Sequence, residues 1–344
     1  MILPRFDVLV PETVDEACKV LVEYRDKGVR ILAGGTDLLV DLRTPIISQH
    51  VPRCDGCPTH PQGNIYSTID CTMWSTDPLM DAGGSLRTAL RDPKKPPPKY
   101  LVSLHKISEL KGIQMLDDGS LKIGAMTTIT EIERSKLVRE NWTALGEGAD
   151  SLGSPLVRNR GTLGGNIANA RPAADTFVPT IALAGVIMLQ GPSGIRIIPS
   201  HEFARGPGIS VMTPDEILTA VIFPSPLPYS GSAYYKLANR KALEISTVGV
   251  AVWLSLEKPG GAVADVRLAL GAVGPTPILA ESVKKTLIGK IPDNIIIAEA
   301  ARSAAKDARP IDDHRGSAWY RLQMVEILVG RLLKSALARA EGQR

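Results

Sequence analysis

The spacing of hydrophobic positions along this chain changes several times, and each change predicts a change of secondary structure. A short extended segment at 6–10 is followed by Thr13 and Glu16, whose spacing is that of a capping box at the start of a helix. Apolar residues then recur at helical spacing, and a strand follows at 29–32. The first part of the chain should therefore fold as strand, helix and strand.

Regular patterning continues through most of the remaining sequence. A period of two predicts strands at 100–104, 120–125, 248–256 and 266–273. Helical spacing predicts amphipathic helices at 295–306 and 317–340. From about residue 232 onward, we therefore expect long strands and helices in alternation.

The stretch from about Thr44 to Pro98 breaks this regularity. It has scattered proline and glycine, no clear periodicity, and three of the four cysteines of the chain. It ends in a proline-rich run, which favours extended and solvated backbone. Long irregular stretches inside compact domains are rarely neutral filler. We interpret this stretch as an insertion.

Composition narrows the class of protein. The net charge is only +4 and aromatic residues make up 4%, which argues against binding to nucleic acid. No apolar run approaches the roughly 18–20 residues of a membrane span. The N-terminal residues lack the apolar stretch of a signal peptide, and four cysteines are too few for a secreted disulfide scaffold. We expect a cytoplasmic protein, and the 344 residues suggest two or three domains.

Two loops with paired glycines, more than a hundred residues apart, are the main chemical signal. The first, Ala33–Asp37, follows the strand at 29–32, and the second runs from Gly161 to Ala170. Glycines let main-chain N–H groups approach an anion closely, and a helix that begins there adds its dipole. One such loop alone is usually an ordinary turn, and the spacing is not that of a Rossmann fingerprint. Together, the loops suggest two sides of a clamp on one diphosphate.

These loops resemble the FAD-binding loops of the flavoprotein, or medium, subunit of molybdenum hydroxylases, the family of carbon monoxide dehydrogenase and xanthine dehydrogenase. The run Gly316–Arg321 is similar to the Ser-x-x-Tyr-Arg helix start of that family. The resemblance implies an α+β fold. It would have a two-subdomain FAD-binding region of the vanillyl-alcohol-oxidase/p-cresol-methylhydroxylase type and a C-terminal domain of antiparallel strands and helices. The implied domains are 1–105, with the insertion at about 44–98, then 106–230 and 231–344.

The resemblance also implies a function. The chain would carry FAD and pass electrons from the [2Fe–2S] clusters of a small partner subunit to an external acceptor. Substrate would be oxidised on a large molybdopterin subunit, so no catalytic residue is expected in this chain, and the flavin would supply the chemistry. We expect a dimer of heterotrimers. The substrate and the electron acceptor (NAD, a quinone, ferredoxin or dioxygen) stay open.

The family motifs carry over to particular residues here. Backbone N–H groups from both glycine loops would bind the diphosphate. Asp175 would hold a polar part of the cofactor, Leu218 would pack near the flavin ring, and Lys236 would contact its polar edge, where a cation stabilises reduced flavin. The ordinary alternatives are a helix cap for Asp175, a core position for Leu218 and a surface position for Lys236. The full set of expected cofactor-binding residues is Ala33, Gly34, Gly35, Thr36, Asp37, Leu38, Thr162, Gly164, Gly165, Asn166, Asp175, Leu218 and Lys236.

The cysteines of the insertion are a separate signal. Cys54 and Cys57 form a C-x-x-C pair, and Cys71 follows. Thiolates at this spacing suit zinc or an iron–sulfur cluster, but a tetrahedral site then lacks one ligand. The candidates for that ligand are His60, His50, Asp55 or a group from elsewhere in the chain. The alternative is an insertion with ordinary thiols that serves as a docking surface for a partner subunit.

Two other functions compete with the leading one. The first is a stand-alone FAD oxidase or reductase of the same superfamily, which would need its own catalytic base near the flavin. The sequence offers no convincing candidate for that base. The second is an assembly protein that has kept the fold and lost the cofactor. The intact glycine pairs of both loops argue against it.

Overall fold

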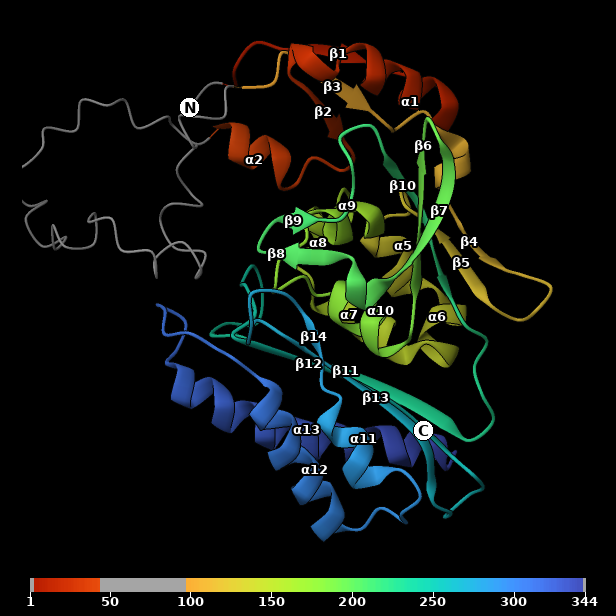
Figure 1. Cartoon of the computed structure of the whole chain (residues 1–344), viewed down its shortest axis with the longest axis vertical. Coiled ribbons are helices and arrows are strands. Elements are labelled where there is room, and N and C mark those ends of the chain that lie inside the picture. The colour runs from red at the N-terminus through yellow and green to blue at the C-terminus, as the bar shows by residue number, and fades with distance from the viewer. Residues whose placement is uncertain (1–2, 44–96, 343–344) are drawn as a thin grey trace, which may run out of the picture. The chain divides into compact units, whose positions relative to one another are not determined.

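The computed structural model of the chain describes residues 3–43 and 97–342 (Figure 1). It separates into two units, one of Met1–Arg5 with Asp37–Pro97, and one of Phe6–Thr36 with Pro98–Arg344. In the described part of the first unit, the secondary structure is one helix, α2 (Leu38–Arg43).

The predicted insertion lies outside the described residues, apart from its last two prolines. Cys54, Cys57 and Cys71 fall in the same undescribed range, so their role stays a prediction.

The second unit begins with a small parallel sheet. The sequence pattern predicts its three strands but not how they pair. Its strands are β1 (Asp7–Leu9), β2 (Val29–Leu32) and β3 (Tyr100–Ser103), with β3 between the other two. Helix α1 (Val14–Glu23) connects β1 to β2, and the Thr13 side chain accepts a hydrogen bond from the Glu16 N–H at its start. The apolar face of α1 packs with Val102 and Leu104 in a separate small core. This sheet ends at the first glycine loop.

A five-stranded antiparallel sheet forms the middle of this unit. Its order is β4 (Ile113–Met115), β5 (Leu121–Gly124), β10 (Ile217–Phe223), β6 (Val186–Gly191) and β7 (Gly194–Pro199). Short helices share a hydrophobic core with it: α5 (Ile129–Arg134), α6 (Lys136–Asn141), α7 (Thr143–Ser151), α8 (Pro155–Arg158), α9 (Leu163–Ala168) and α10 (Phe177–Ala182). A two-stranded ribbon, β8 (Ala204–Gly206) with β9 (Ile209–Ser210), completes this part.

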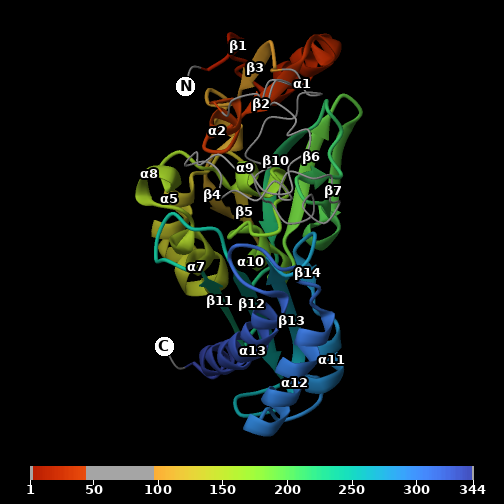
Figure 2. The same ribbon diagram turned by 90° about the vertical axis from the view of Figure 1, so that its left-hand side faces the viewer.

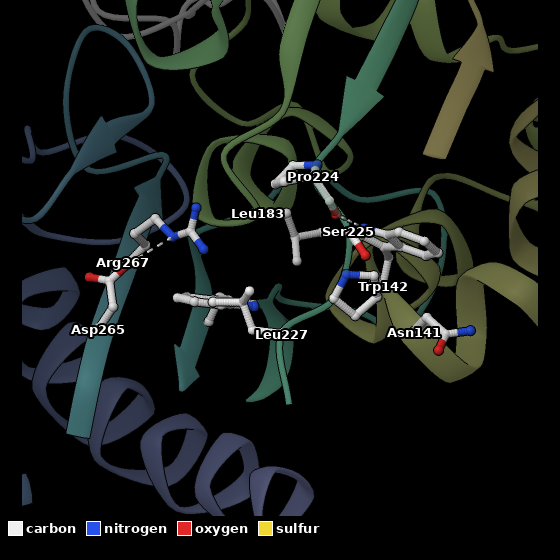
Figure 3. Close-up of a pocket in the computed structure, with 10 residues that line it drawn as sticks. Asn141, Trp142, Leu183, Pro224, Ser225, Leu227, Asp265 and Arg267 are labelled. Carbon is white, nitrogen blue, oxygen red and sulfur yellow. Dashed lines mark hydrogen bonds and ion pairs between the residues drawn. The ribbon is translucent and has the colours of Figure 1, made fainter. Parts of the chain in front are cut away.

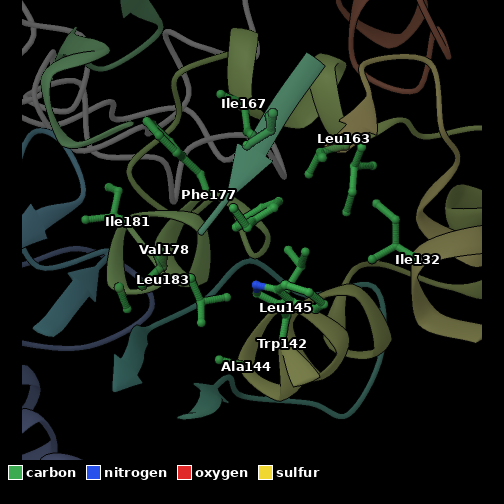
Figure 4. Packing of buried hydrophobic residues seen from close by; sticks show 14 of the residues in the cluster. Ile132, Trp142, Ala144, Leu145, Leu163, Ile167, Phe177, Val178, Ile181 and Leu183 are labelled. Atoms are coloured by element: carbon green, nitrogen blue, oxygen red, sulfur yellow. The ribbon is translucent and has the colours of Figure 1, made fainter. Parts of the chain in front are cut away.

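One large hydrophobic core joins these helices to the sheet. Figure 4 shows Trp142 and Leu145 of the α6–α7 region and Phe177 of α10, which belong to the same buried cluster. Phe177 has no exposed surface, and burial of a side chain of that size contributes about 1.5–3 kcal/mol. The core holds the second glycine loop in place, because Leu163 and Ile167 of α9 belong to it.

The C-terminal part is an antiparallel sheet with helices on one face (Figures 1 and 2). Its strands, in order, are β11 (Ser230–Leu237), β12 (Val248–Leu256), β13 (Val263–Gly271) and β14 (Ile278–Leu279). The helices are α11 (Ser282–Leu287), α12 (Asn294–Asp307) and α13 (Ala318–Ala340). The predicted strands and both predicted helices of this region are confirmed.

Strand β12 is buried along its whole length because both of its faces are covered. Val250 and Val252 point to the core shared with α12 and α13, whereas Ala251 and Trp253 belong to the core of the preceding region. Successive residues of a strand point to opposite faces, so one strand serves both cores. In the described part of the chain, no helix is long and apolar enough to cross a membrane.

Candidate functional site

The two glycine loops, far apart in sequence, lie against each other. A Cβ atom added at Gly34 would overlap the carbonyl group of Arg160 and stand 3.1 Å from the Gly161 Cα atom. A Cβ added at Gly165 would lie 3.6 Å from the Ala33 Cβ atom. At Gly34 the loops can approach this closely only because glycine has no side chain, whereas the distance at Gly165 is an ordinary van der Waals contact.

The first loop offers main-chain donors that the protein itself does not use. Within the described residues, the N–H groups of Ala33, Gly34, Gly35 and Thr36 donate to no acceptor. Gly35 has a φ of 76°, in the region that favours glycine. All four residues are half-buried. A half-buried run of unpaired N–H groups suits an anion, because such donors otherwise lose their hydrogen bonds to water. Asp37 and Leu38 continue the sequence into α2, which belongs to the other unit.

The second loop differs from the expectation. The N–H of Gly164 donates to the Ala125 carbonyl (2.9 Å), and those of Gly165 and Asn166 donate to the side chain and carbonyl of Thr162. In this structure these three N–H groups therefore have partners within the protein, and their contact with a diphosphate stays a prediction. The physical reason is that the Thr162 side chain caps α9 through the Gly165 N–H, the Asn166 N–H makes a helical bond, and the Ala125 segment takes up the Gly164 N–H.

The glycines of the second loop have a packing role instead. A Cβ at Gly164 would stand 2.6 Å from the Ala125 Cβ atom, so only glycine lets α9 lie against the neighbouring segment. The Asn166 side-chain oxygen accepts hydrogen bonds from the N–H and the hydroxyl of Thr176. This fixes the orientation of the amide, and its NH₂ group has no acceptor in the described part of the chain. Among the described contacts, the Thr162 N–H also has no acceptor.

Asp175 lies at the centre of a buried polar cluster that sequence reasoning missed. Its Oδ2 atom is 2.6 Å from Lys236 Nζ, and its Oδ1 atom accepts hydrogen bonds from Ser246 (2.8 Å) and from the Tyr234 hydroxyl (3.0 Å). The side chains of Asp175 and Lys236 are each only 8% exposed. Asp175 thus takes its partners from the C-terminal sheet region. It does not cap α10, and Lys236 is not a surface residue, so both ordinary alternatives are wrong.

Burial and charge act on these groups in opposite directions. Burial raises the pKa of Asp175, and the neighbouring Lys236 ammonium is the largest opposing influence. The pKa of Tyr234 lies well above its usual value, chiefly because the hydroxyl is buried and secondly because the Asp175 charge is near. The cluster therefore keeps the tyrosine hydroxyl protonated, so that it donates to the carboxylate.

The comparisons with known proteins agree with this geometry. Residues 78–226 match the FAD-binding domain in molybdopterin dehydrogenase, and residues 233–336 match the C-terminal domain of the CO dehydrogenase flavoprotein. The chain belongs to this flavoprotein family. It is the FAD-binding subunit of a molybdenum hydroxylase, and hence part of an oxidoreductase.

Similarity to known proteins extends over most of the chain and supports its membership of this family. It is 35% identical to a putative xanthine dehydrogenase FAD-binding subunit of Escherichia coli, over 71% of this chain and 84% of the relative. It is 33% identical to the carbon monoxide dehydrogenase medium chain of Hydrogenophaga pseudoflava, over 77% and 91%. A chain of the solved carbon monoxide dehydrogenase from that organism superposes with a TM-score of 0.79 at 28% identity, covering 98% of this chain and 99% of that one. The α+β fold expected from the resemblance is confirmed.

Leu218 of the flavoprotein lies in its large core. It is 4% exposed and sits on β10, where the pairing with β6 shifts register between Leu218 and Ala220. The structure thus places it in the core, the ordinary alternative for this residue. Within the described ranges, no group of three or more His, Cys, Asp or Glu side chains could hold a metal ion.

One signal in the sequence could have found part of the buried cluster. Tyr234 and Lys236 are two residues apart on β11, so their side chains share a face of the sheet. The pattern of an aromatic hydroxyl and a lysine on one face of a buried strand indicates a shared acidic partner. Ser246 gives no such signal, because it lies outside any regular element.

Proposed function

We propose that the flavoprotein is the electron-transfer subunit of a cytoplasmic complex, in which it works with a small [2Fe–2S] subunit and a large molybdopterin subunit. A dimer of these heterotrimers is the assembly we propose. The main support for FAD binding is the contact between the two glycine loops, together with the unpaired N–H groups of Ala33–Thr36 beside it. This arrangement supports a diphosphate-binding cradle.

The donors present fit the diphosphate of FAD. We assign the N–H groups of Ala33–Thr36 to one side of it, and the Thr162 N–H with the Asn166 NH₂ group to the other. Gly164 and Gly165 act by keeping the loop close, since their own N–H groups are used within the protein. By sequence, Asp37 and Leu38 complete the first loop. When bound, FAD supplies the chemistry that exchanges electrons between one-electron clusters and an acceptor.

Lys236 is proposed to contact the polar edge of the flavin ring. Its ammonium group has three donors, and two of them are used, by the Ser151 carbonyl (3.2 Å) and by Asp175 (2.6 Å). The third donor is available for the cofactor. Asp175 then acts by orienting Lys236 through their hydrogen bond, rather than by touching the cofactor itself.

The domain division supports the same assignment. The linker Pro224–Tyr229 joins β10 to β11, and it overlaps the gap at 227–232 between the two matched family domains. We propose 1–105, with the insertion at about 44–98, and 106–230 as the FAD-binding subdomains. Residues 231–344 form the C-terminal domain in this division.

The test measures how much FAD is bound by a variant in which a side chain fills the space between the two glycine loops. Gly34→Ala adds a Cβ where the Arg160 carbonyl lies, which forces the two loops apart. We expect a folded protein with at least about tenfold less bound FAD, measured by absorbance after gel filtration. The matched control is Gly330→Ala in α13, where the new Cβ lies 4.0 Å from its nearest neighbour. Full flavin content in Gly34→Ala would contradict the cradle.

A second measurement separates the subunit from a stand-alone oxidoreductase. The tagged chain, purified from its native cells, should bring two other subunits with it in equal amounts, together with iron and molybdenum. A catalytically complete single chain would contradict the proposed assembly.

A further inference from the structure

Arg321 ends the Gly316–Arg321 run, and the proposed FAD site leaves its role unexplained. It lies in the first turn of α13 and is only 4% exposed. Its Nη1 atom donates to the Ala272 carbonyl (3.0 Å), and its Nη2 atom donates to the Asp313 carboxylate. In the described part of the chain, its Nε atom has no acceptor. Because desolvation of a guanidinium is costly, the two groups that it holds indicate why it is buried here.

Ala272 connects Arg321 to the segment that follows the second glycine loop. Its φ is 60°, a conformation that few residues other than glycine adopt and that needs support from its surroundings. The support comes from both sides, because its carbonyl accepts from Arg321 and its N–H donates to the Pro172 carbonyl (2.8 Å). A Cβ at the preceding Gly271 would stand 3.1 Å from the same Pro172 oxygen. The end of β13 thus lies directly against Pro172.

Pro172 belongs to a tight turn that leads to Asp175. Within this turn, the Ala174 N–H donates to the Arg171 carbonyl (3.1 Å), and Asp175 is the next residue. A displacement of Pro172 would therefore move the Asp175 carboxylate away from Lys236, to which it is bonded at 2.6 Å. The first path from Arg321 to the buried polar cluster runs through this turn.

A second path runs through Asp313. The main-chain groups of Asp313 and Gly316 exchange two hydrogen bonds (3.2 and 3.1 Å), so the carboxylate held by the guanidinium fixes this turn. A Cβ at Gly316 would lie 3.5 Å from the Thr247 Cγ2 atom, which shows that the turn lies against Thr247. The neighbouring Ser246 donates to Asp175 Oδ1 (2.8 Å). The same guanidinium therefore approaches the cluster from a second side.

We propose that Arg321 is a positioning residue for the flavin. Through Ala272 and Asp313 it holds the Asp175 carboxylate in place, and Asp175 in turn directs the Lys236 ammonium group towards the cofactor. This inference rests on the proposed contact between Lys236 and the flavin ring.

The midpoint potential of the flavin in the full-length, FAD-loaded chain tests the proposal, because a cation at the polar edge of the ring stabilises reduced flavin. Lys236→Gln should weaken the preference for reduced flavin about tenfold, which lowers the potential by about 30 mV for a two-electron couple. Arg321→Gln should lower it by at least about threefold, or about 15 mV. The potential belongs to the flavin that stays bound, so a merely structural role, which would lower stability or FAD content, would leave it unchanged.

The Arg321→Gln variant should still fold, because Asp313 keeps a second cation. Arg315 Nη1 is 3.1 Å from Asp313 Oδ2, and the Arg315 N–H donates to Oδ1 (2.7 Å). Removal of Arg321 therefore leaves no buried carboxylate unpaired. Arg321→Lys keeps the charge but loses the forked donors, so it should give a smaller fall in potential, and it serves if the glutamine variant does not fold.

Arg267 provides the matched control. Figure 3 shows it beside Asp265 at a pocket near the linker, and its side chain is 19% exposed. Its Nε atom also has no hydrogen-bond acceptor among the described residues, and its guanidinium stacks on the Trp253 ring at 3.7 Å. In the described ranges, none of the residues that line this pocket belongs to the cluster around Asp175. Arg267→Lys should therefore cost stability without changing the flavin potential.

The possible results separate this inference from the assignment on which it rests. An unchanged potential in the Arg321 variants, with a lowered one in Lys236→Gln, would overturn the positioning role and leave the Lys236 assignment standing. Equal falls in Arg267→Lys and Arg321→Gln would also overturn it, because they would reflect a general loosening of the domain. An unchanged potential in Lys236→Gln would contradict the proposed contact with the flavin ring, and the inference with it.

Discussion

The carboxylate of Asp175 lies 2.6 Å from the ammonium group of Lys236, and more than nine-tenths of each side chain is buried. Asp175 follows the second glycine loop, whereas Lys236 lies on the first strand of the C-terminal sheet. This ion pair therefore ties the FAD-binding region to the C-terminal domain. The cost of desolvating two charges means that such a pair depends on both members being present.

Removal of one member should be strongly destabilising. Lys236→Met leaves the Asp175 carboxylate buried without its cation, and we expect a loss of about 3–5 kcal/mol in the free energy of unfolding. Asp175→Asn should also destabilise, because the buried Lys236 ammonium group loses its carboxylate partner. The double variant should lose less than the sum of the two single losses, since no charge is left unpaired. Urea denaturation of all three variants measures this coupling, and strictly additive losses would contradict it.

The hydroxyl of Tyr234 should contribute separately to the same cluster. Tyr234→Phe removes a hydrogen bond to a buried carboxylate, so we expect a loss of about 1.5–3 kcal/mol in unfolding free energy. The neighbouring Tyr235 is 50% exposed, and Tyr235→Phe should change stability by no more than about 0.5 kcal/mol. Thermal denaturation of the two variants makes the comparison. Equal melting temperatures would show that the Tyr234 hydroxyl adds nothing.

The ion pair between Arg196 and Glu216 should give the protein a defined response to acid. The hydrogen bonds from Arg196 lower the pKa of Glu216, which also accepts from the Thr213 N–H (2.7 Å). A carboxyl group whose pKa is lower in the folded state stabilises the protein above its unfolded pKa of about 4.3. That contribution is lost as the pH falls through the folded-state pKa.

Glu216→Gln tests this pH dependence. The variant should be less stable than the unmodified chain at pH 7, and the difference should shrink below about pH 4. Urea midpoints between pH 3 and 7 measure it. Glu281→Gln is the control, because its partner Lys284 lies on the surface and the Glu281 side chain is 59% exposed, so the change should be under about 1 kcal/mol at either pH. A difference that stays constant with pH would contradict the role of Arg196.

The cysteines of the insertion carry a prediction that concerns residues outside the described ranges. We expect Cys54, Cys57 and Cys71 to bind zinc or an iron–sulfur cluster, because three of the four cysteines fall within this short stretch. Metal and acid-labile sulfide analysis of the isolated subunit tests for the bound metal or cluster. Cys18→Ser is the control, because Cys18 is buried in the small core that α1 shares with β3. A metal-free subunit would favour a docking role for the insertion.

The sequence predicts local structure well where the cause is local. The cap at Thr13 and the strands of the C-terminal sheet are examples, because capping and alternation depend on residues a few positions apart. Family motifs also predict that both glycine loops belong to one site, and the structure brings them together.

Other features depend on partners distant in sequence. Tyr234 and Lys236 indicate a shared acidic partner, but Asp175 is 61 positions from Lys236 and no pattern identifies it as that partner. The donor of Gly164 is used within the protein because a third segment, at Ala125, packs against the loop. Whether a donor is free is a property of the folded chain, and a motif records only the residue type.

The parallel pairing of β2 with β3 has a consequence for how this chain can evolve. Val29 lies opposite Tyr100 and Leu32 opposite Ser103, and the Lys99 N–H donates to the Gly28 carbonyl (2.8 Å). The strand pairing thus holds the chain where it leaves β2, at Leu32, and the Lys99–Gly28 hydrogen bond holds it where it returns to β3. The entropic cost of closing a loop rises by only about 0.6 kcal/mol for each doubling of its length. Segments of very different length can therefore be gained or lost between these strands while the same sheet forms, which makes this junction a natural place for relatives to acquire new partners.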